Sequence, residues 1–209
     1  PDRDAARIGT FDLKGFIQRG YAVAHVFYGD IYPDFQHDNT LGVPSLFGAP
    51  PKVRRSGDWG ANGAWSWGLS RVMDWLVTEP EVDANKVALA GVSRLGKAVL
   101  WAGAQDRRFA VVVPWVSGEG GASISRRFYG ETVADLTNPA RYPYWFAPRY
   151  QDYAFKVDEL PVDGHFLLAM IAPRRNTGVS AGARQNFSSS SSSQVNVSEQ
   201  PAMSRLVTY

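Results

Sequence analysis

The sequence of 209 residues contains no cysteine, so neither a disulfide nor a thiolate metal site can form. Histidine is scarce as well, with only three in the chain. A histidine that acts as a general base must therefore be His25, His37 or His165.

Long apolar runs and an excess of one charge are also missing. No stretch is long and apolar enough to span a membrane, and no signal peptide opens the chain. The formal net charge is +2, without a run of Lys or Arg, so we expect no nucleic-acid partner and no membrane partner. The first ten residues resemble the interior of a larger protein, and we expect a monomer.

The chain does have enough apolar residues, 44% of its length, to bury one substantial core. Seven Trp and nine Tyr are many for this length. Aromatic side chains suit a carbohydrate-facing surface, but a large core uses them too.

The chain is organised around residues 87–105. The apolar run Val87–Ala90, closed by Gly91, is typical of a buried parallel strand. Residues 94–105 follow with apolar positions near helical spacing, so Ser93 falls in a sharp turn from strand to helix. Such a turn is the geometry of a nucleophile elbow, although a serine N-cap in an ordinary turn is the alternative.

Other segments complete an alternating order of strands and helices. Residues 21–28 are a predicted central strand of the sheet, and residues 109–116 are another predicted strand, while residues 11–19 and 60–77 are predicted helices. This order requires parallel pairing with right-handed crossovers, so the predicted fold class is α/β. His25, inside the first strand, is expected to be a core histidine.

The predicted loop over residues 29–57 is long and rich in Pro and Gly, so it is a candidate wall of a site. It carries Asp30, Asp34, His37 and Asp38. A metal site made from these residues is conceivable, but no ligand spacing supports it, and we expect neither a metal nor a cofactor.

Asp163 and His165 precede the apolar run 166–172 and could form a triad with Ser93. A histidine this close to an apolar helix is more often structural. The composition changes abruptly after Arg174, and a run of six serines occupies residues 188–193. We therefore predict one domain over residues 1–174 and a disordered tail, without strands, over residues 175–209.

Several stretches together resemble the glucuronoyl esterases of carbohydrate esterase family 15, and most of all their bacterial members. The matching stretches are RGYAVAHVFYGDIYPDF (19–35), GDWGANGAWSWGLSRVMDWL (57–76), VDANKVALAGVSRLGKAVLWAGAQDRRFA (82–110), SGEGGASISRRFYGETV (117–133) and LPVDGHFLLAMIAPR (160–174). The resemblance spans roughly residues 19–174, and it explains an elbow of the form G-x-S-R-x-G-K.

The resemblance implies an α/β-hydrolase fold, incomplete at both ends, and a cofactor-free reaction. That reaction is hydrolysis of esters between 4-O-methyl-glucuronate of xylan and lignin alcohols, by a secreted or periplasmic enzyme. By motif, Ser93 is the nucleophile, and Arg94 supplies a backbone N–H and a guanidinium to the oxyanion. Lys97 and Glu131 would bind the uronate hydroxyls, and they would be an ordinary surface pair if the motif were accidental.

Two departures from the family pattern bear on activity. The position where many members keep a catalytic acid is Val116 here, and Glu119 lies three residues later, so the acid role is not transferred to either. The family's catalytic His follows the IAPR segment in a region that this sequence lacks, and His165 matches a different family position.

These departures leave three interpretations open. The first is a partial glucuronoyl esterase that is inactive as given. The second is a carbohydrate-binding relative without catalysis, and the third is a serine esterase of other specificity that uses Ser93 with His165.

Overall fold

The computed structural model describes residues 12–37, 40–47, 53–176 and 205–208. Six α-helices are described: α2 (Leu13–Gln18), α3 (Tyr28–Ile31), α4 (Ala61–Leu76), α5 (Arg94–Gln105), α6 (Val133–Thr137) and α7 (Gly164–Ile171). The strands are β1 (Ala22–His25), β2 (Val87–Val92), β3 (Val111–Trp115), β4 (Arg175–Asn176) and β5 (Arg205–Thr208). Short 3₁₀ turns lie at Val43–Phe47, Ala84–Lys86, Ser125–Arg127, Pro148–Tyr153 and Val157–Glu159.

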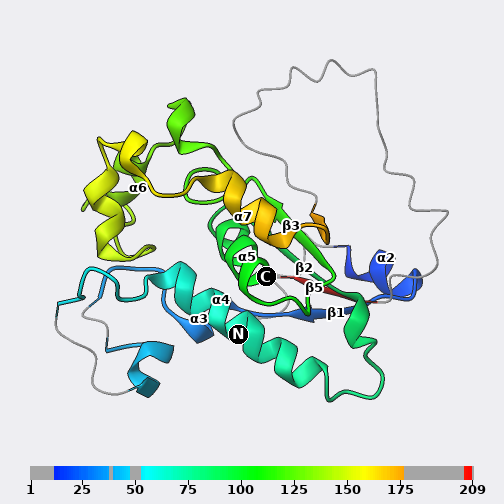
Figure 1. The fold of residues 1–209 in the computed structure, drawn as a ribbon. Coiled ribbons are helices and arrows are strands. Elements are labelled where there is room, and N and C mark those ends of the chain that lie inside the picture. Colours follow the sequence, from blue (N-terminus) through cyan, green and yellow to red (C-terminus); the bar gives the residue numbers. More distant parts are fainter. Residues whose placement is uncertain (1–11, 38–39, 48–52, 177–204, 209) are drawn as a thin grey trace.

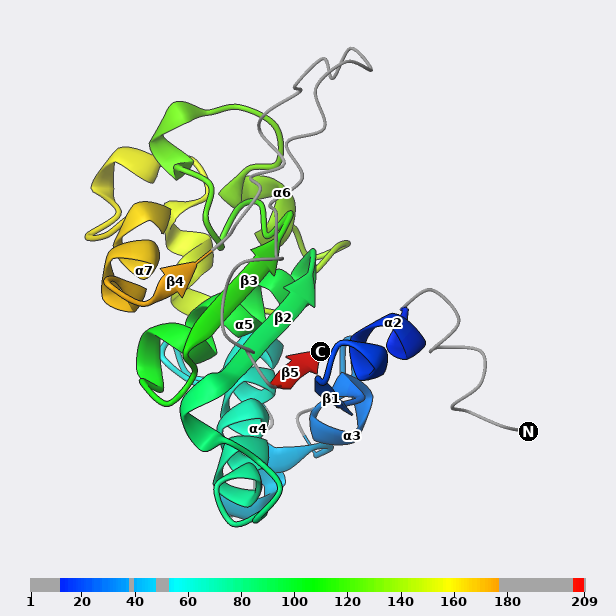
Figure 2. The same cartoon turned by 90° about the vertical axis from the view of Figure 1, so that its right-hand side faces the viewer.

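The five strands form one parallel sheet in the order β1-β5-β2-β3-β4. Figure 2 shows β3, β2, β5 and β1 side by side in this order. Helix α5 packs on β2 and β3 and also contacts α4 and α7, so it lies at the centre of the helical layer. Figure 1 shows α6 and α2 at opposite ends of the molecule. The predicted α/β class is confirmed.

The elements around the elbow match their predicted bounds. Strand β2 ends at Val92 and helix α5 begins at Arg94, so Ser93 lies in the turn between them, as predicted. The predicted helices 11–19 and 60–77 are α2 and α4, and the predicted strand 109–116 is β3. Apolar periodicity was a reliable signal for α4 and β3 because both elements contribute residues to the core.

The prediction that no strand follows Arg174 is wrong at both ends of the tail. Strand β4 pairs with β3, and β5 pairs with both β1 and β2. Strands β1 and β2 do not pair with each other and leave one strand's width between them, where the backbone of β5 completes both ladders. Residues 177–204 and Tyr209, including the serine run, lie outside the described residues.

Three predictions near the N-terminal end are also corrected by the structure. The predicted strand 21–28 is only Ala22–His25, and it is the first strand in the sheet order rather than an internal one. His25 is exposed instead of lying in the core. The predicted loop 29–57 begins inside the short helix α3 and contains a 3₁₀ turn. Tyr28, the first residue of α3, packs against Trp65 with ring centroids 5.3 Å apart.

Helix α5 lies unusually close to the sheet because three positions have no side chain. A Cβ on Gly91 would lie 2.5 Å from the Leu95 carbonyl oxygen, and one on Gly96 would lie 2.7 Å from the Trp115 carbonyl oxygen. A Cβ on Gly103 would lie 2.5 Å from Val112. Real Cβ atoms do not approach so closely, so the spacing G-x-S-R-x-G encodes the contact between helix and sheet.

Helix α4 is held at its N-terminus by the aromatic segment 142–146. The backbone N–H groups of Ala61 and Asn62 donate to the carbonyl oxygens of Tyr144 and Trp145, at 2.9 and 3.1 Å. These bonds satisfy two of the free N–H groups with which every helix begins. The apolar face of α4, with Trp65, Leu69 and Met73 fully buried, then packs toward α5.

In the part of the chain that the structure describes, no helix is long and apolar enough to cross a membrane.

The close approach of α5 predicts that Gly96→Ala lowers the free energy of unfolding by about 1–3 kcal/mol, the usual cost of an overpacked core. Chemical denaturation followed by circular dichroism measures it. The matched control is Gly63→Ala in α4, where a Cβ would lie 3.6 Å from its nearest neighbour. Gly63→Ala should stabilise by about 0.5–1 kcal/mol through helix propensity, and equal behaviour of the two variants would contradict the packing argument.

Candidate functional site

Ser93 has the backbone geometry of a nucleophile elbow. Its φ of 59° and ψ of −121° lie where a residue with a side chain is strained. Two backbone hydrogen bonds fix this conformation: the Ser93 N–H donates to the Trp115 carbonyl at 2.9 Å, and the Lys97 N–H donates to the Ser93 carbonyl at 3.1 Å. Ser93 itself is exposed at the carboxyl edge of the sheet. An elbow of this kind presents a serine hydroxyl to substrate and the next backbone N–H to an oxyanion.

The Arg94 guanidinium is fixed by an aspartate from the long segment that follows β1. Its Nη1 forms an ion pair with Asp34 Oδ2. The Asp34 carboxylate also accepts hydrogen bonds from Trp145 Nε1 at 2.8 Å and from the Tyr144 hydroxyl at 3.1 Å. The guanidinium carbon lies 5.0 Å from the Trp145 ring centroid, and Tyr142 stacks on that ring at 4.0 Å. These contacts hold a fixed cation beside the elbow.

Burial of the Arg94 guanidinium opposes its charge, but the hydrogen bond and the charge of Asp34 raise the pKa of Arg94 above its ordinary value. Arg94 therefore stays cationic at every accessible pH. Asp34 was predicted only as part of a site wall, since nothing in the spacing of the sequence joins it to Arg94.

Lys97 and Glu131 are brought together although 34 positions separate them. The Lys97 ammonium donates to the Ser117 carbonyl at 2.6 Å and lies 3.4 Å from Glu131 Oε2. The Lys97 side chain is 3% exposed, whereas Glu131 is 35% exposed and faces solvent in part. Burial lowers the pKa of Lys97, and the nearby Glu131 carboxylate offsets part of that shift.

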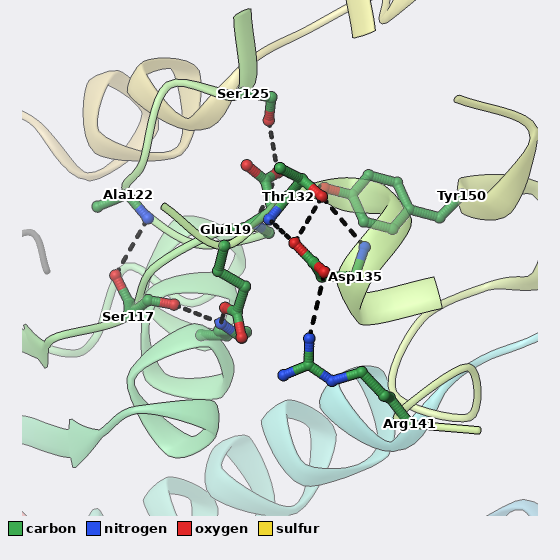
Figure 3. Close-up of polar contacts among 11 residues, drawn as sticks. Ser117, Glu119, Ala122, Ser125, Thr132, Asp135, Arg141 and Tyr150 are labelled. Carbon is green, nitrogen blue, oxygen red and sulfur yellow. Dashed lines mark hydrogen bonds and ion pairs between the residues drawn. The ribbon is translucent and has the colours of Figure 1, made fainter. Parts of the chain in front are cut away.

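Glu131 is positioned by the start of helix α6. The Thr132 hydroxyl accepts from the Asp135 N–H at 3.1 Å, and the Asp135 carboxylate accepts from the Thr132 N–H at 3.0 Å. Figure 3 shows this capping box, with Arg141 paired to Asp135 at 3.4 Å. The T-x-x-D pattern signals the capping box in the sequence. The box fixes the backbone beside Glu131, the residue just before Thr132.

Glu119 is a buried carboxylate with several donors. Its Oε1 accepts from the Ser125 hydroxyl at 2.5 Å, the Tyr150 hydroxyl at 2.8 Å and the Gly120 N–H at 3.0 Å (Figure 3). Burial, and secondly the Glu119 charge, raise the pKa of Tyr150. Glu119 thus holds the loop after β3 together, a role that was not predicted from the sequence.

Asp163 caps helix α7, and its hydrogen bonds and ion pair among the described residues go to Ser125, Arg126 and Gly164, not to the elbow. It accepts from the backbone N–H groups of Gly164 at 2.7 Å, Ser125 at 2.8 Å and Arg126 at 3.3 Å. Burial opposes its ionisation, but these donors together lower the pKa of Asp163. His165 is exposed on α7, with its ring 4.5 Å from that of Phe166.

Within the described residues, Ser93 Oγ has no hydrogen-bond partner. The three histidines lie in different surroundings: His25 on the exposed end of β1, His37 beside the rings of Tyr32 and Phe35, and His165 on α7. The structure therefore brings Lys97 and Glu131 together and places Arg94 at the elbow, but it pairs no described histidine with Ser93.

Val116 adds a second strained position at the same edge of the sheet. It follows β3 with φ of 43°, which is rare for a β-branched residue, and it is 40% exposed.

Over residues 12–37, 40–47, 53–176 and 205–208, no group of three or more His, Asp or Glu could hold a metal ion. The predicted cluster in the long segment is partly outside these residues, because Asp38 is not described.

A cavity of about 750 Å³ lies beside α4 and α5, between them and the segments 120–125 and 145–167. Lys97 lines it, but Ser93, Arg94 and Glu131 do not. The elbow, where the strain and the cation lie, is the candidate catalytic centre, and the cavity lies beside it and shares Lys97 and Trp145 with the residues around it.

Comparison with known proteins gives a consistent result. The family model described as fungal glucuronyl esterase matches residues 53–201. The chain is 42% identical over 166 residues to carbohydrate esterase MZ0003 of an unknown prokaryotic organism, covering 79% of this chain and 38% of that protein. It is 37% identical over 123 residues to a 4-O-methyl-glucuronoyl methylesterase of Podospora anserina, covering 55% of this chain and 26% of that protein.

Solved structures agree. A glucuronoyl esterase from Solibacter usitatus superposes with a TM-score of 0.77 at 43% identity, covering 85% of this chain and 46% of that one. The catalytic domain from Hypocrea jecorina gives a TM-score of 0.62 at 25% identity, over 78% of this chain and 50% of that one. The chain spans half or less of the length of each of these relatives. The predicted α/β-hydrolase fold is confirmed, and with the family model matching most of its length and a strained G-x-S-R-x-G-K elbow at Ser93, this chain belongs to the glucuronoyl esterase family.

Proposed function

We propose that this chain carries the nucleophile and the uronate-binding residues of an esterase for 4-O-methyl-glucuronate esters, such as those that join xylan to lignin. The observation that carries the proposal is the strained Ser93 at the carboxyl edge of the sheet, with a fixed cation beside it. We expect it to act as a monomer outside the cytoplasm, with no cofactor and no nucleic-acid partner.

The proposed reaction begins when the Ser93 hydroxyl attacks the ester carbonyl carbon. Negative charge then develops on the carbonyl oxygen, where the Arg94 N–H and guanidinium favour the tetrahedral intermediate over the neutral ester. The alcohol leaves, an acyl-enzyme forms at Ser93, and water hydrolyses it to the free uronate.

Specificity for the uronate ring is proposed to come from Lys97 and Glu131. The buried ammonium is a donor, and the partly exposed carboxylate is an acceptor, so together they match neighbouring ring hydroxyls. Their fixed positions, set by Ser117 and by the capping box of α6, reduce the entropy lost on binding.

Proton transfer is the step for which the described residues give least support. A serine hydroxyl needs a base within hydrogen-bond reach, and no described histidine is paired with Ser93. Binding of the uronate without turnover is therefore the second candidate function. The serine esterase that would use His165 is less favoured, because Asp163 is engaged by backbone donors and His165 lies exposed against Phe166.

We predict that the purified chain hydrolyses a methyl or benzyl ester of glucuronate no faster than its Ser93→Ala variant. In a well-studied serine hydrolase, loss of the base alone lowers turnover by about 10⁶. Chromatography measures the release of the free acid or the alcohol. Turnover far above the Ser93→Ala control would contradict the prediction, and His165→Ala would then show whether His165 is the base.

A second prediction concerns the pH dependence of stability. The pKa of Lys97 is lowered in the folded chain, so at a pH between that value and the ordinary 10.5 the unfolded chain binds more protons. The free energy of unfolding should therefore rise with pH through this window, because the penalty for burying the ammonium is relieved. Lys97→Met should lack this part of the rise, as measured by denaturant titrations at several pH values.

The control for this prediction is Lys86→Met, because Lys86 is an exposed lysine paired with Asp83. Its removal should leave the rise unchanged.

Lys97→Met and Glu131→Gln should each also weaken binding of methyl glucuronate about tenfold or more, which corresponds to losing one charged hydrogen bond. Unchanged binding in both variants would rule out the proposed uronate site.

A further inference from the structure

The cavity beside α4 has walls that are mostly aromatic or aliphatic. Its volume of about 750 Å³ lies in the range of about 300–1,000 Å³ that is typical of small-molecule sites. Ring side chains come from three parts of the chain and include Trp59, Trp67, Trp101, Phe146 and Tyr153. Trp59 and Trp101 are 44% and 39% exposed, so they lie where the cavity meets solvent.

One polar side chain in this wall has no partner. Asn62, in the first turn of α4, is 7% exposed, and both its Oδ1 and its Nδ2 are buried without a hydrogen bond to any described residue. An unpaired buried amide costs about 1–3 kcal/mol for each polar group. A group that entered the cavity and met this amide would remove that cost.

The other buried polar groups of the wall are already satisfied. The Ser66 hydroxyl lies 2.7 Å from both the Asn62 and the Ala98 carbonyl oxygens, and the hydroxyls of Ser125 and Tyr150 both donate to Glu119. Lys97 donates to Ser117. Asn62 is thus the buried polar group of the wall that is left to recognise a ligand.

We propose that this cavity binds a hydroxylated aromatic ring, a phenol in chemical class, at a site beside the elbow that Ser93 and Arg94 do not line. The ring would stack among the Trp and Phe side chains. A phenolic hydroxyl has one donor and accepts at the same oxygen, so it can donate to Asn62 Oδ1 and accept from Nδ2 after the amide turns toward the cavity. A sugar ring fits less well at the buried end of the cavity, because among the described residues of the wall Asn62 is the buried side chain without a partner, and one amide cannot serve several hydroxyls.

The test uses 4-methylphenol as the probe, toluene as its analogue without the hydroxyl, and methyl β-D-glucoside as the sugar. Binding to the purified chain is measured by calorimetry and by ligand-observed NMR. We expect 4-methylphenol to bind more tightly than toluene and the glucoside to bind most weakly. Asn62→Leu should weaken 4-methylphenol about tenfold, the effect of losing its hydrogen bonds, and should leave toluene unchanged.

Two further variants locate the site and guard against misfolding. Gly63 lines the cavity and has room for a Cβ, so Gly63→Met should fill the cavity and weaken both aromatic probes while the near-ultraviolet circular dichroism stays native. Ser93→Ala should bind both as the parent chain does. The proposal is overturned if neither aromatic probe binds, if the glucoside binds more tightly, if Asn62→Leu affects both aromatic probes equally, or if Gly63→Met changes neither.

Discussion

The close approach of helix α5 to strands β2 and β3 is the constraint on which the rest of the structure depends. Gly91, Gly96 and Gly103 leave no room for a Cβ, so backbone meets backbone at Gly91 and Gly96, and the Val112 side chain packs directly on the backbone of Gly103. The Ser93 N–H donates to the Trp115 carbonyl where the β2–β3 ladder ends, and the strained φ of Ser93 persists because the surrounding packing determines it. The elbow is thus a product of strand pairing and helix packing together and not of one turn alone.

Three buried charged groups show how a small fold can bury ions. Lys97, Glu119 and Asp163 each have partners fixed by the backbone or by a hydroxyl, which replace the water lost on burial. Removal of one partner would leave an uncompensated buried charge. The stability of the fold therefore constrains the identity of these three residues, in addition to any contact with substrate. The same loop after β3 contributes the Ser117 carbonyl to Lys97 and the Glu119 carboxylate to Ser125, which connects the proposed uronate site to the loop's own stability.

Asp34 shows where sequence reasoning was too coarse. It lies in a segment rich in Pro and Gly that was predicted only as a site wall, yet it pairs with Arg94 and accepts from Tyr144 and Trp145. These partners lie 60 to 111 positions away. No local pattern encodes such a contact, and only the packing of the aromatic segment against the N-terminus of α4 brings the four residues together.

The sequence by itself determined the parallel α/β order, the bounds of β2 and α5, and the position of Ser93 between them, because apolar periodicity and the spacing of Gly91 and Gly96 are local properties. Predictions from the sequence were wrong about the burial of His25 and about residues 205–208, where no strand was expected. The apolar run around His25 resembles an internal strand, whereas the short Arg205–Thr208 segment follows a serine-rich stretch with no apolar period. Only the tertiary structure decided these points, because a strand's place in a sheet depends on which backbone edges are left unpaired, and that is fixed by non-local pairing.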